Sequence, residues 1–175
     1  MTRVWTAALA AVAMLFGAAA PAAAENMTAG IIGVNGNGIG VVTLIESPGG
    51  VLLRIQIVPG GLPAGAHGMH LHSVGDCSDI GTFKRSKGHI NEDGREHGLL
   101  NPNGPDNADL PNLVVREDGT ADVELFTSRV RLVVGQPALL DSDGSALVIH
   151  ANADDHMTQP IGGAGPRIAC AEIKR

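Results

Sequence analysis

The stretch GAHGMHLHSVGD, at residues 65–76, is the part of the sequence around which the other candidate site residues gather. Its core is the triplet His70-Leu71-His72. In an extended strand, residues two apart point to the same face, so both imidazoles can aim at one point while Leu71 faces an apolar interior. This arrangement is typical of a metal site, although a half-exposed strand with two surface histidines fits the triplet equally well.

The first 24 residues have the three parts of a secretory signal peptide. A basic head with Arg3 precedes an apolar run, and the sequence AAA at positions 22–24 predicts cleavage after Ala24. The apolar run is short for a spanning helix, and no second long run follows. We therefore expect an exported domain at residues 25–175 with no membrane partner. The Ala-rich signal is of bacterial type, which makes the periplasm the natural compartment.

The composition of residues 25–175 constrains both the core and the partners. Removal of Arg3 with the signal leaves 18 acidic and 11 basic residues, a formal net charge of −7. An acidic surface disfavours nucleic acid and anionic membranes as partners. The only aromatic residues among Phe, Trp and Tyr are Phe83 and Phe126, so the core must be aliphatic.

The two cysteines, Cys77 and Cys170, both survive processing. In an exported protein an even number of cysteines predicts a disulfide, and here one intramolecular pairing is available. Closing a loop of this length stabilises the fold by about 4–5 kcal/mol in the chain-entropy model.

Short β-branched and aliphatic runs separated by glycine-rich turns predict antiparallel strands in a sandwich or barrel. The turn SPGG at residues 47–50, Asp118-Gly119 and Asp143-Gly144 are strong turn signals. Helical periodicity is not evident after residue 24. The expected strands cover residues 31–34, 40–46, 51–58, 67–73, 113–115, 121–125, 146–150 and 167–173.

Two stretches, residues 75–111 and 151–166, consist mostly of Gly, Asp, Asn, Pro and His. Loops this long in a compact domain are usually functional or disordered. Five of the seven histidines lie in or next to them, so we interpret both as functional loops.

The histidine-bearing motifs resemble those of the copper/zinc superoxide dismutase family. GAHGMHLHSVGDC, GHIN, EHGLLNP, DLPNLVVREDGTA, ALVIHANADD and IGGAGPRIACAEI occur in the family's order and at nearly its spacings, over residues 61–173. The resemblance implies a Greek-key β-sandwich or flattened barrel of about eight antiparallel strands with two long loops. It also implies an enzyme that converts superoxide to oxygen and hydrogen peroxide, with copper and zinc as cofactors and a homodimer as the common assembly.

The resemblance implies a role for each site residue. Copper ligands are expected at His70, His72, His89 and His150, and zinc ligands at His89, His97 and Asp109, with the ring of His89 shared by both metals. Asp154 matches the carboxylate that hydrogen-bonds one ligand of each metal. His67 matches a position that packs and hydrogen-bonds behind the copper ligands, and Cys77 and Cys170 match the family's disulfide.

Two residues are expected to be catalytic, Arg167 and His89. Arg167 matches the arginine over the copper that attracts superoxide, and its guanidinium stays protonated and donates hydrogen bonds. His89 can take up a proton and return it to the second superoxide. Because the protein is acidic, steering of the anion must be local. Lys84, Arg85 and Lys87 are candidates for that field, or else a solvated basic run.

The sequence departs from the family where a third zinc histidine is expected and Asp106 occurs instead. Zinc accepts carboxylate oxygen, so Asp106 can complete a site of four ligands that is weaker or differently tuned. A poorly occupied zinc site is the competing interpretation. We expect His156 to be exposed, with a role as substitute zinc ligand as a minor alternative, and Met69 to pack in the core.

Function classes other than a two-metal enzyme also fit parts of the sequence. One is a copper-binding or copper-delivery module with the same fold, although Arg167 and Asp154 would be unnecessary for metal storage. Another is a copper-only dismutase or a non-catalytic relic with a degenerate zinc site, for which Asp106 is the support. Fold alone does not separate these classes, because function belongs to the site.

Overall fold

The computed structural model describes residues 1, 25–133, 135 and 137–175. The expected signal peptide therefore lies outside the described residues, apart from Met1. Apart from one short 3-10 turn, the regular secondary structure of the described part is all β-strand, as the sequence predicted, and this part contains no helix long and apolar enough to cross a membrane. The strands are β1 (Asn26–Gly33), β2 (Gly38–Ser47), β3 (Gly50–Ile57), β4 (Gly65–His67), β5 (Met69–His72), β6 (Leu113–Val115), β7 (Ala121–Thr127), β8 (Ser145–His150) and β9 (Arg167–Ile173), and one 3-10 turn, η1, spans Lys84–Ser86.

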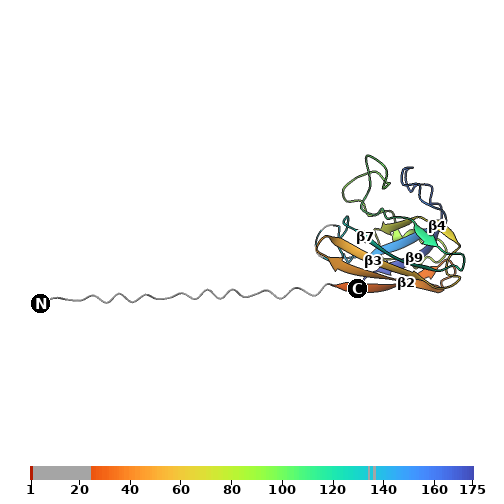
Figure 1. Cartoon of the computed structure of the whole chain (residues 1–175), viewed down its shortest axis with the longest axis horizontal. Coiled ribbons are helices and arrows are strands. Elements are labelled where there is room, and N and C mark those ends of the chain that lie inside the picture. The colour runs from red at the N-terminus through yellow and green to blue at the C-terminus, as the bar shows by residue number, and fades with distance from the viewer. Residues whose placement is uncertain (2–24, 134, 136) are drawn as a thin grey trace.

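Seven strands form one antiparallel sheet in the order β5-β8-β9-β1-β2-β3-β7, and β4 pairs with β6 in a second, small sheet. Pairing of β1 with β9 and of β3 with β7 joins strands that are far apart in the sequence. Figure 1 shows the long loops after β5 (green) and after β8 (dark blue) rising next to each other above the strands, on the same side of the molecule. The predicted β-sandwich or flattened barrel with two long loops is thus confirmed.

Alternation along the strands builds an aliphatic core. In β3 the side chains of Val51, Leu53, Ile55 and Ile57 are buried, whereas Arg54 and Gln56 between them are exposed. Alternating side chains of a strand face opposite sides of a sheet, so this pattern fixes which face of β3 packs inward. A smaller apolar cluster contains Phe83 and the two cysteines. The cysteines form the predicted Cys77–Cys170 disulfide.

The predicted strand at residues 67–73 is instead two strands in different sheets, separated at Gly68. A Cβ atom on Gly68 would lie 2.8 Å from the Ala164 Cβ atom and 3.2 Å from that of Asp154. The Gly68 N–H donates to the Asn152 carbonyl oxygen at 2.8 Å. The chain therefore crosses from the small sheet to the large one directly beneath the loop of residues 151–166, where only glycine fits.

Candidate metal centre

Strand β5 holds its histidines in place through both of its edges. On one edge β8 pairs with it, with His70 opposite Val148. On the other edge, two segments of the loop after β5 bind the backbone of Leu71. The Leu71 N–H donates to the Ala108 carbonyl oxygen at 3.1 Å, and the Ile90 N–H donates to the Leu71 carbonyl oxygen at 2.9 Å. These bonds set His89 beside His72 and Asp109 beside His70. As predicted, Leu71 and Met69 are fully buried in the aliphatic core.

The histidines expected to bind copper each present one buried ring nitrogen with no hydrogen-bond partner among the described residues. One ligand atom from each of His70, His72 and His150 lies within 4.8 Å of the other two. A buried polar atom without a partner costs about 1–3 kcal/mol, so these nitrogens favour a bound ion. The atoms concerned are His70 Nδ1, His72 Nε2, His89 Nε2 and His150 Nε2.

The other ring nitrogens of these histidines are held by the protein. His72 Nδ1 donates to the Lys87 carbonyl oxygen and His150 Nδ1 to that of Gly165, each at 2.8 Å. His70 Nε2 lies 2.9 Å from Asp154 Oδ2. Hydrogen bonds of this kind fix the ring orientation and leave the opposite nitrogen as the metal-binding atom.

Burial also keeps these histidines neutral. It lowers the pKa of His70, lowers that of His72 well below its usual value and lowers that of His150 to about 4. Since a neutral imidazole has the lone pair that a metal needs, the three rings are ready to bind at neutral pH.

The residues expected to bind zinc form a second group next to the first. Ligand atoms of His89, His97, Asp106 and Asp109 all lie within 4.8 Å of one another. His89 Nδ1 is 2.8 Å from Asp106 Oδ2, and His97 Nδ1 is 2.6 Å from Asp109 Oδ1. Two imidazole nitrogens and two carboxylate oxygens are a donor set that fits tetrahedral zinc.

Backbone groups orient both carboxylates of this second group. Asp106 Oδ1 accepts from the Ala108 N–H at 2.9 Å, and Asp109 Oδ2 accepts from the N–H groups of Gly98 at 2.7 Å and Asp106 at 3.0 Å. Each carboxylate therefore keeps its other oxygen facing a histidine. Asp106, which replaces a histidine of the family pattern, is thus oriented by one backbone N–H, whereas Asp109 is oriented by two.

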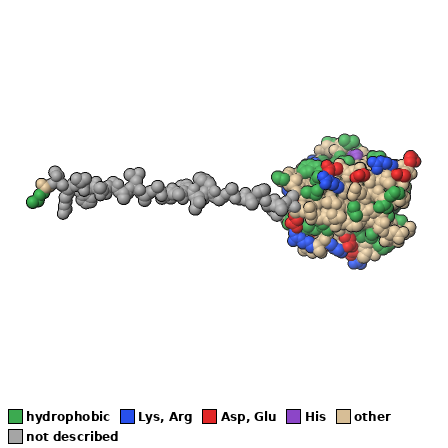
Figure 2. All heavy atoms as spheres, turned by 60° about the horizontal axis from the view of Figure 1, so that its bottom comes forward, with side chains coloured by type: hydrophobic (Ala, Val, Ile, Leu, Met, Phe, Trp, Pro, Cys, Tyr) green, Lys and Arg blue, Asp and Glu red, His purple; other side chains and the backbone are tan. Residues whose placement is uncertain are grey.

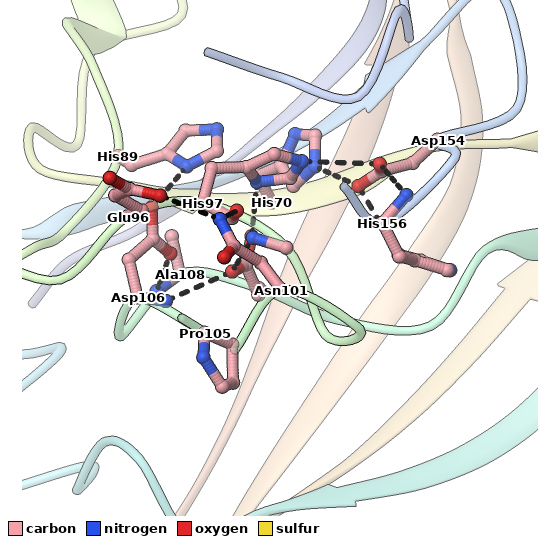
Figure 3. Close-up of polar contacts among 12 residues, drawn as sticks. His70, His89, Glu96, His97, Asn101, Pro105, Asp106, Ala108, Asp154 and His156 are labelled. Carbon is pink, nitrogen blue, oxygen red and sulfur yellow. Dashed lines mark hydrogen bonds and ion pairs between the residues drawn. The ribbon is translucent and has the colours of Figure 1, made fainter. Parts of the chain in front are cut away.

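Asp154 links the two groups. Its carboxylate oxygens lie 2.9 Å from His70 Nε2 and 3.1 Å from His97 Nε2 (Figure 3). Although burial raises the pKa of Asp154, hydrogen bonds from these two rings lower it well below its usual value, so it is ionised. A methyl group on Gly162 would overlap this carboxylate, and its φ of +60° also favours glycine.

Carboxylates act on His97 in the opposite direction. Burial lowers its pKa, but hydrogen bonds to Asp109 and Asp154 outweigh burial and raise the pKa to about 10. His97 is therefore an imidazolium in the metal-free protein, held between two anions.

The prediction that His156 is exposed is wrong. Its side chain is only 18 % exposed, since Nδ1 lies 3.4 Å from Asp154 Oδ2 and Nε2 lies 3.2 Å from Asn112 Nδ2. Its backbone N–H also donates to Asp154 Oδ1 at 2.7 Å (Figure 3). His156 thus supports Asp154, and it belongs to neither group of candidate ligands among the described residues.

Gln159 joins the two long loops, a role that the sequence analysis missed. Its amide accepts from the His97 N–H at 3.1 Å and donates to the His97 carbonyl oxygen at 2.8 Å. The Leu100 N–H adds a further bond to the His156 carbonyl oxygen at 3.0 Å. No local sequence pattern distinguishes this glutamine from other polar loop residues, so its structural role could not be predicted.

Arg167 lies beside the copper-facing histidines and is anchored by the loop that carries η1. Its Nη1 donates to Phe83 O at 2.6 Å and to Ser86 Oγ at 3.2 Å, and its Nη2 donates to Lys87 O at 2.6 Å. His67 lies behind the site, with its ring nitrogens 2.8 Å from His150 O and 2.9 Å from Pro63 O.

A cavity of about 760 Å³ opens over both groups. Its lining includes His72, His89, His97, His150 and Arg167. Of the three cations expected to steer substrate, Lys84 lines this cavity. Arg85 does not, and its Nε is 2.7 Å from Asp76 Oδ2. Lys87 is not in the lining either.

Comparison with known proteins agrees with this centre. The family model described as "Copper/zinc superoxide dismutase (SODC)" matches residues 39–173. A protein of Caulobacter vibrioides named "Superoxide dismutase [Cu-Zn]" is 48% identical over 143 residues, covering 80% of this chain and 80% of that protein. "Superoxide dismutase [Cu-Zn] 2" of Aquifex aeolicus is 41% identical over 146 residues, covering 82% and 84%.

Solved structures agree as well. A superoxide dismutase-like protein from Bacillus subtilis superposes with a TM-score of 0.79 at 34% identity, covering 83% of this chain and 97% of that one. "Cu/Zn superoxide dismutase from Brucella abortus" superposes with a TM-score of 0.67 at 25% identity, covering 85% and 99%.

Proposed function

Because the chain belongs to the copper/zinc superoxide dismutase family, we propose that its histidine-rich centre is where superoxide is disproportionated. Two superoxide anions and two protons give one molecule of oxygen and one of hydrogen peroxide. The observation that carries this assignment is that His70, His72, His89 and His150 each present a buried ring nitrogen with no hydrogen-bond partner among the described residues. Such a set suits a copper ion, for which imidazole is a preferred ligand.

In this proposal the copper ligands are His70, His72, His89 and His150, and the zinc ligands are His89, His97, Asp106 and Asp109. When bound, copper supplies one-electron transfer and zinc supplies a positive charge next to the shared ring. Asp154 orients one ring of each group, so it sets the geometry of both halves at once.

Arg167 is the group that receives the substrate. Three of the five N–H donors of its guanidinium bind the protein, which leaves two for an anion in the cavity. Burial lowers its pKa from a very high value, and arginine still stays protonated. Its fixed position lets it orient superoxide as well as attract it.

His89 is the group that handles a proton. Its Nδ1 is 2.8 Å from Asp106 Oδ2, while its Nε2 is buried and free on the other side of the ring. We assign to Nε2 the proton that is held between the two half-reactions and delivered to the second superoxide. The second proton comes from water in the cavity.

The zinc half admits a competing interpretation, because Asp106 adds a negative charge where the family has a neutral histidine. A copper-only dismutase with a degenerate zinc site would explain the substitution. The backbone bond from the Ala108 N–H, which aims Asp106 at His89, supports a working ligand instead, since a decayed site would not need it.

For residues 1–24 we propose a secretory signal peptide and, for the mature chain, a bacterial periplasm. The Cys77–Cys170 disulfide supports an oxidising compartment, because such bonds are rare in the cytosol. A homodimer, and the absence of membrane and nucleic-acid partners, remain predictions.

Metal analysis followed by an activity assay on the same sample tests the proposal. Residues 25–175 are purified with the disulfide intact and reconstituted with both metals. One copper and one zinc per chain with high activity is the expected result. Activity with copper alone would favour the copper-only dismutase, and copper without activity would leave a copper-binding or copper-delivery module.

A further inference from the structure

Three lysine and arginine side chains line the cavity over the metal centre: Lys84, Arg95 and Arg167. Among the described residues, none of the three has a carboxylate oxygen within 4.0 Å of its side-chain nitrogens. By contrast, Arg54, Arg85, Lys174 and Arg175 each have such a partner. A positive charge that is not neutralised by a neighbouring carboxylate attracts an anion from farther away.

Arg95 lies between His89 and His97, apart from the basic run at residues 84–87. Its N–H donates to Asn91 Oδ1 at 3.0 Å and its carbonyl oxygen accepts from Asn91 Nδ2 at 2.7 Å, which fixes its backbone. Its guanidinium Nη2 donates to the Gly104 carbonyl oxygen, two residues before Asp106. The side chain therefore spans the loop that carries the second group of ligands.

The position of Arg95 can be explained by the charge of Asp106. It lines the same cavity, and it puts a negative charge where the family has a neutral histidine. A carboxylate beside the path of an anionic substrate repels that substrate. Arg95, on the same loop and lining the same cavity, supplies a charge of opposite sign.

Charged side chains of both signs occur outside the cavity. Figure 2 shows acidic and basic side chains interspersed on the face in view. The chain as a whole is acidic, so attraction of an anion depends on the charges that line the cavity.

We propose that Arg95 is a positioning residue for superoxide, which guides the anion into the cavity and offsets the negative charge of Asp106. This inference rests on the proposed function of the centre. Lys84 acts on the same path from the loop of η1, so superoxide enters between cations of two separate segments. Arg167 receives it at the bottom of this path.

The test compares Arg95→Gln, Arg95→Lys and Arg116→Gln in the metal-loaded enzyme. Arg116 is the matched control, because it has the same charge, has no carboxylate within 4.0 Å among the described residues and is absent from the cavity lining. Two quantities are measured: kcat/KM for superoxide at ionic strengths from about 0.01 to 1 M, and the Kd of azide from the copper absorption spectrum. Azide serves as an unreactive monoanion.

Arg95→Gln is expected to lower kcat/KM and weaken azide binding by about two- to fivefold at about 0.01 M, with no difference near 1 M, where charges are screened. Arg95→Lys is expected to resemble the wild type, since it keeps the charge. Equal behaviour of Arg95→Gln and Arg116→Gln would overturn the proposal. Loss in Arg95→Lys as large as in Arg95→Gln would also overturn it, because the role would then be to hold the loop. A wild-type protein without activity would refute the proposed function, whereas azide binding would still decide the role of Arg95.

Discussion

The copper-facing and zinc-facing halves of the centre are built by different means. Two strands supply three residues of the copper-facing half, His70 and His72 from β5 and His150 from β8. The zinc-facing half, apart from the shared His89, comes from a loop, and backbone N–H groups rather than strand pairing aim its carboxylates. Strand pairing thus positions most of the copper-facing half, whereas hydrogen bonds within a loop position the zinc-facing half.

The two halves also differ in how their polar atoms are satisfied without metal. The copper-facing nitrogens have no partners among the described residues, and burial lowers the pKa of His70, His72 and His150 so that these rings are neutral. In the zinc-facing half His89 Nδ1 and both ring nitrogens of His97 already face carboxylates, as in the 2.6 Å contact of His97 with Asp109. The copper-facing nitrogens therefore gain their only partner when a metal ion binds, whereas a metal ion in the zinc-facing half must replace existing contacts between histidines and carboxylates.

The largest effects are expected when one metal ligand of either half is replaced by alanine, because each replacement should remove only one of the two metals. His150→Ala is expected to lower activity by at least 100-fold and to remove copper, while zinc stays bound, because His150 takes no part in the zinc-facing group. Asp109→Ala is the counterpart and should lose zinc while copper remains. Metal content by plasma mass spectrometry and activity check both variants. Loss of both metals from either variant would contradict the separation of the halves.

A smaller effect should come from Asp106. Asp106→Ala is expected to weaken zinc binding by about 10- to 100-fold, because one ligand oxygen and its held geometry are removed. Competition with a chromophoric zinc chelator measures the affinity, and Asp122→Ala, at an exposed position of β7, is the charge-matched control. Asp106→His should bind zinc at least as tightly as the wild type. Unchanged affinity in Asp106→Ala would support the copper-only interpretation.

The smallest effect concerns protons. The pKa of His97 is raised to about 10, so at pH 7.5 this ring is charged, and zinc must displace its proton. The pKa of His150 is about 4, so this ring is already neutral and releases none. Zinc affinity should therefore rise with pH between 6 and 9 more steeply than copper affinity. Calorimetry in buffers of different ionisation enthalpy counts the protons, and equal numbers for both metals would contradict this prediction.

Sequence reasoning succeeded where local periodicity decides the structure. The alternation around Leu71 and the runs at residues 113–115 and 167–173 gave the strands β5, β6 and β9 in the right places. It failed at Gly68, because the break there is caused by Ala164 and Asp154 from a loop about 90 residues away. Contacts of that range leave no trace in a local window.

For the site, too, prediction succeeded for residues in recognisable motifs and failed for contacts between distant loops. The resemblance supplied the histidines and acids, and the structure brings them into two adjacent groups. The partial burial of His156 against Asp154, the Gln159 contacts with His97 and the position of Arg95 in the cavity were not predicted from the sequence. Each depends on how two loops pack on each other rather than on the residue type or its neighbours in the chain.

The Gln159 contacts have a consequence for how sequences of this kind can diverge. Because one amide pairs with both backbone groups of His97, the loop after β5 and the loop after β8 meet at a fixed register. An insertion or deletion between Gln159 and β8 would shift that register and displace His97. The lengths of these two loops should therefore change together among descendants, whereas the turn between β2 and β3 is free to vary by itself.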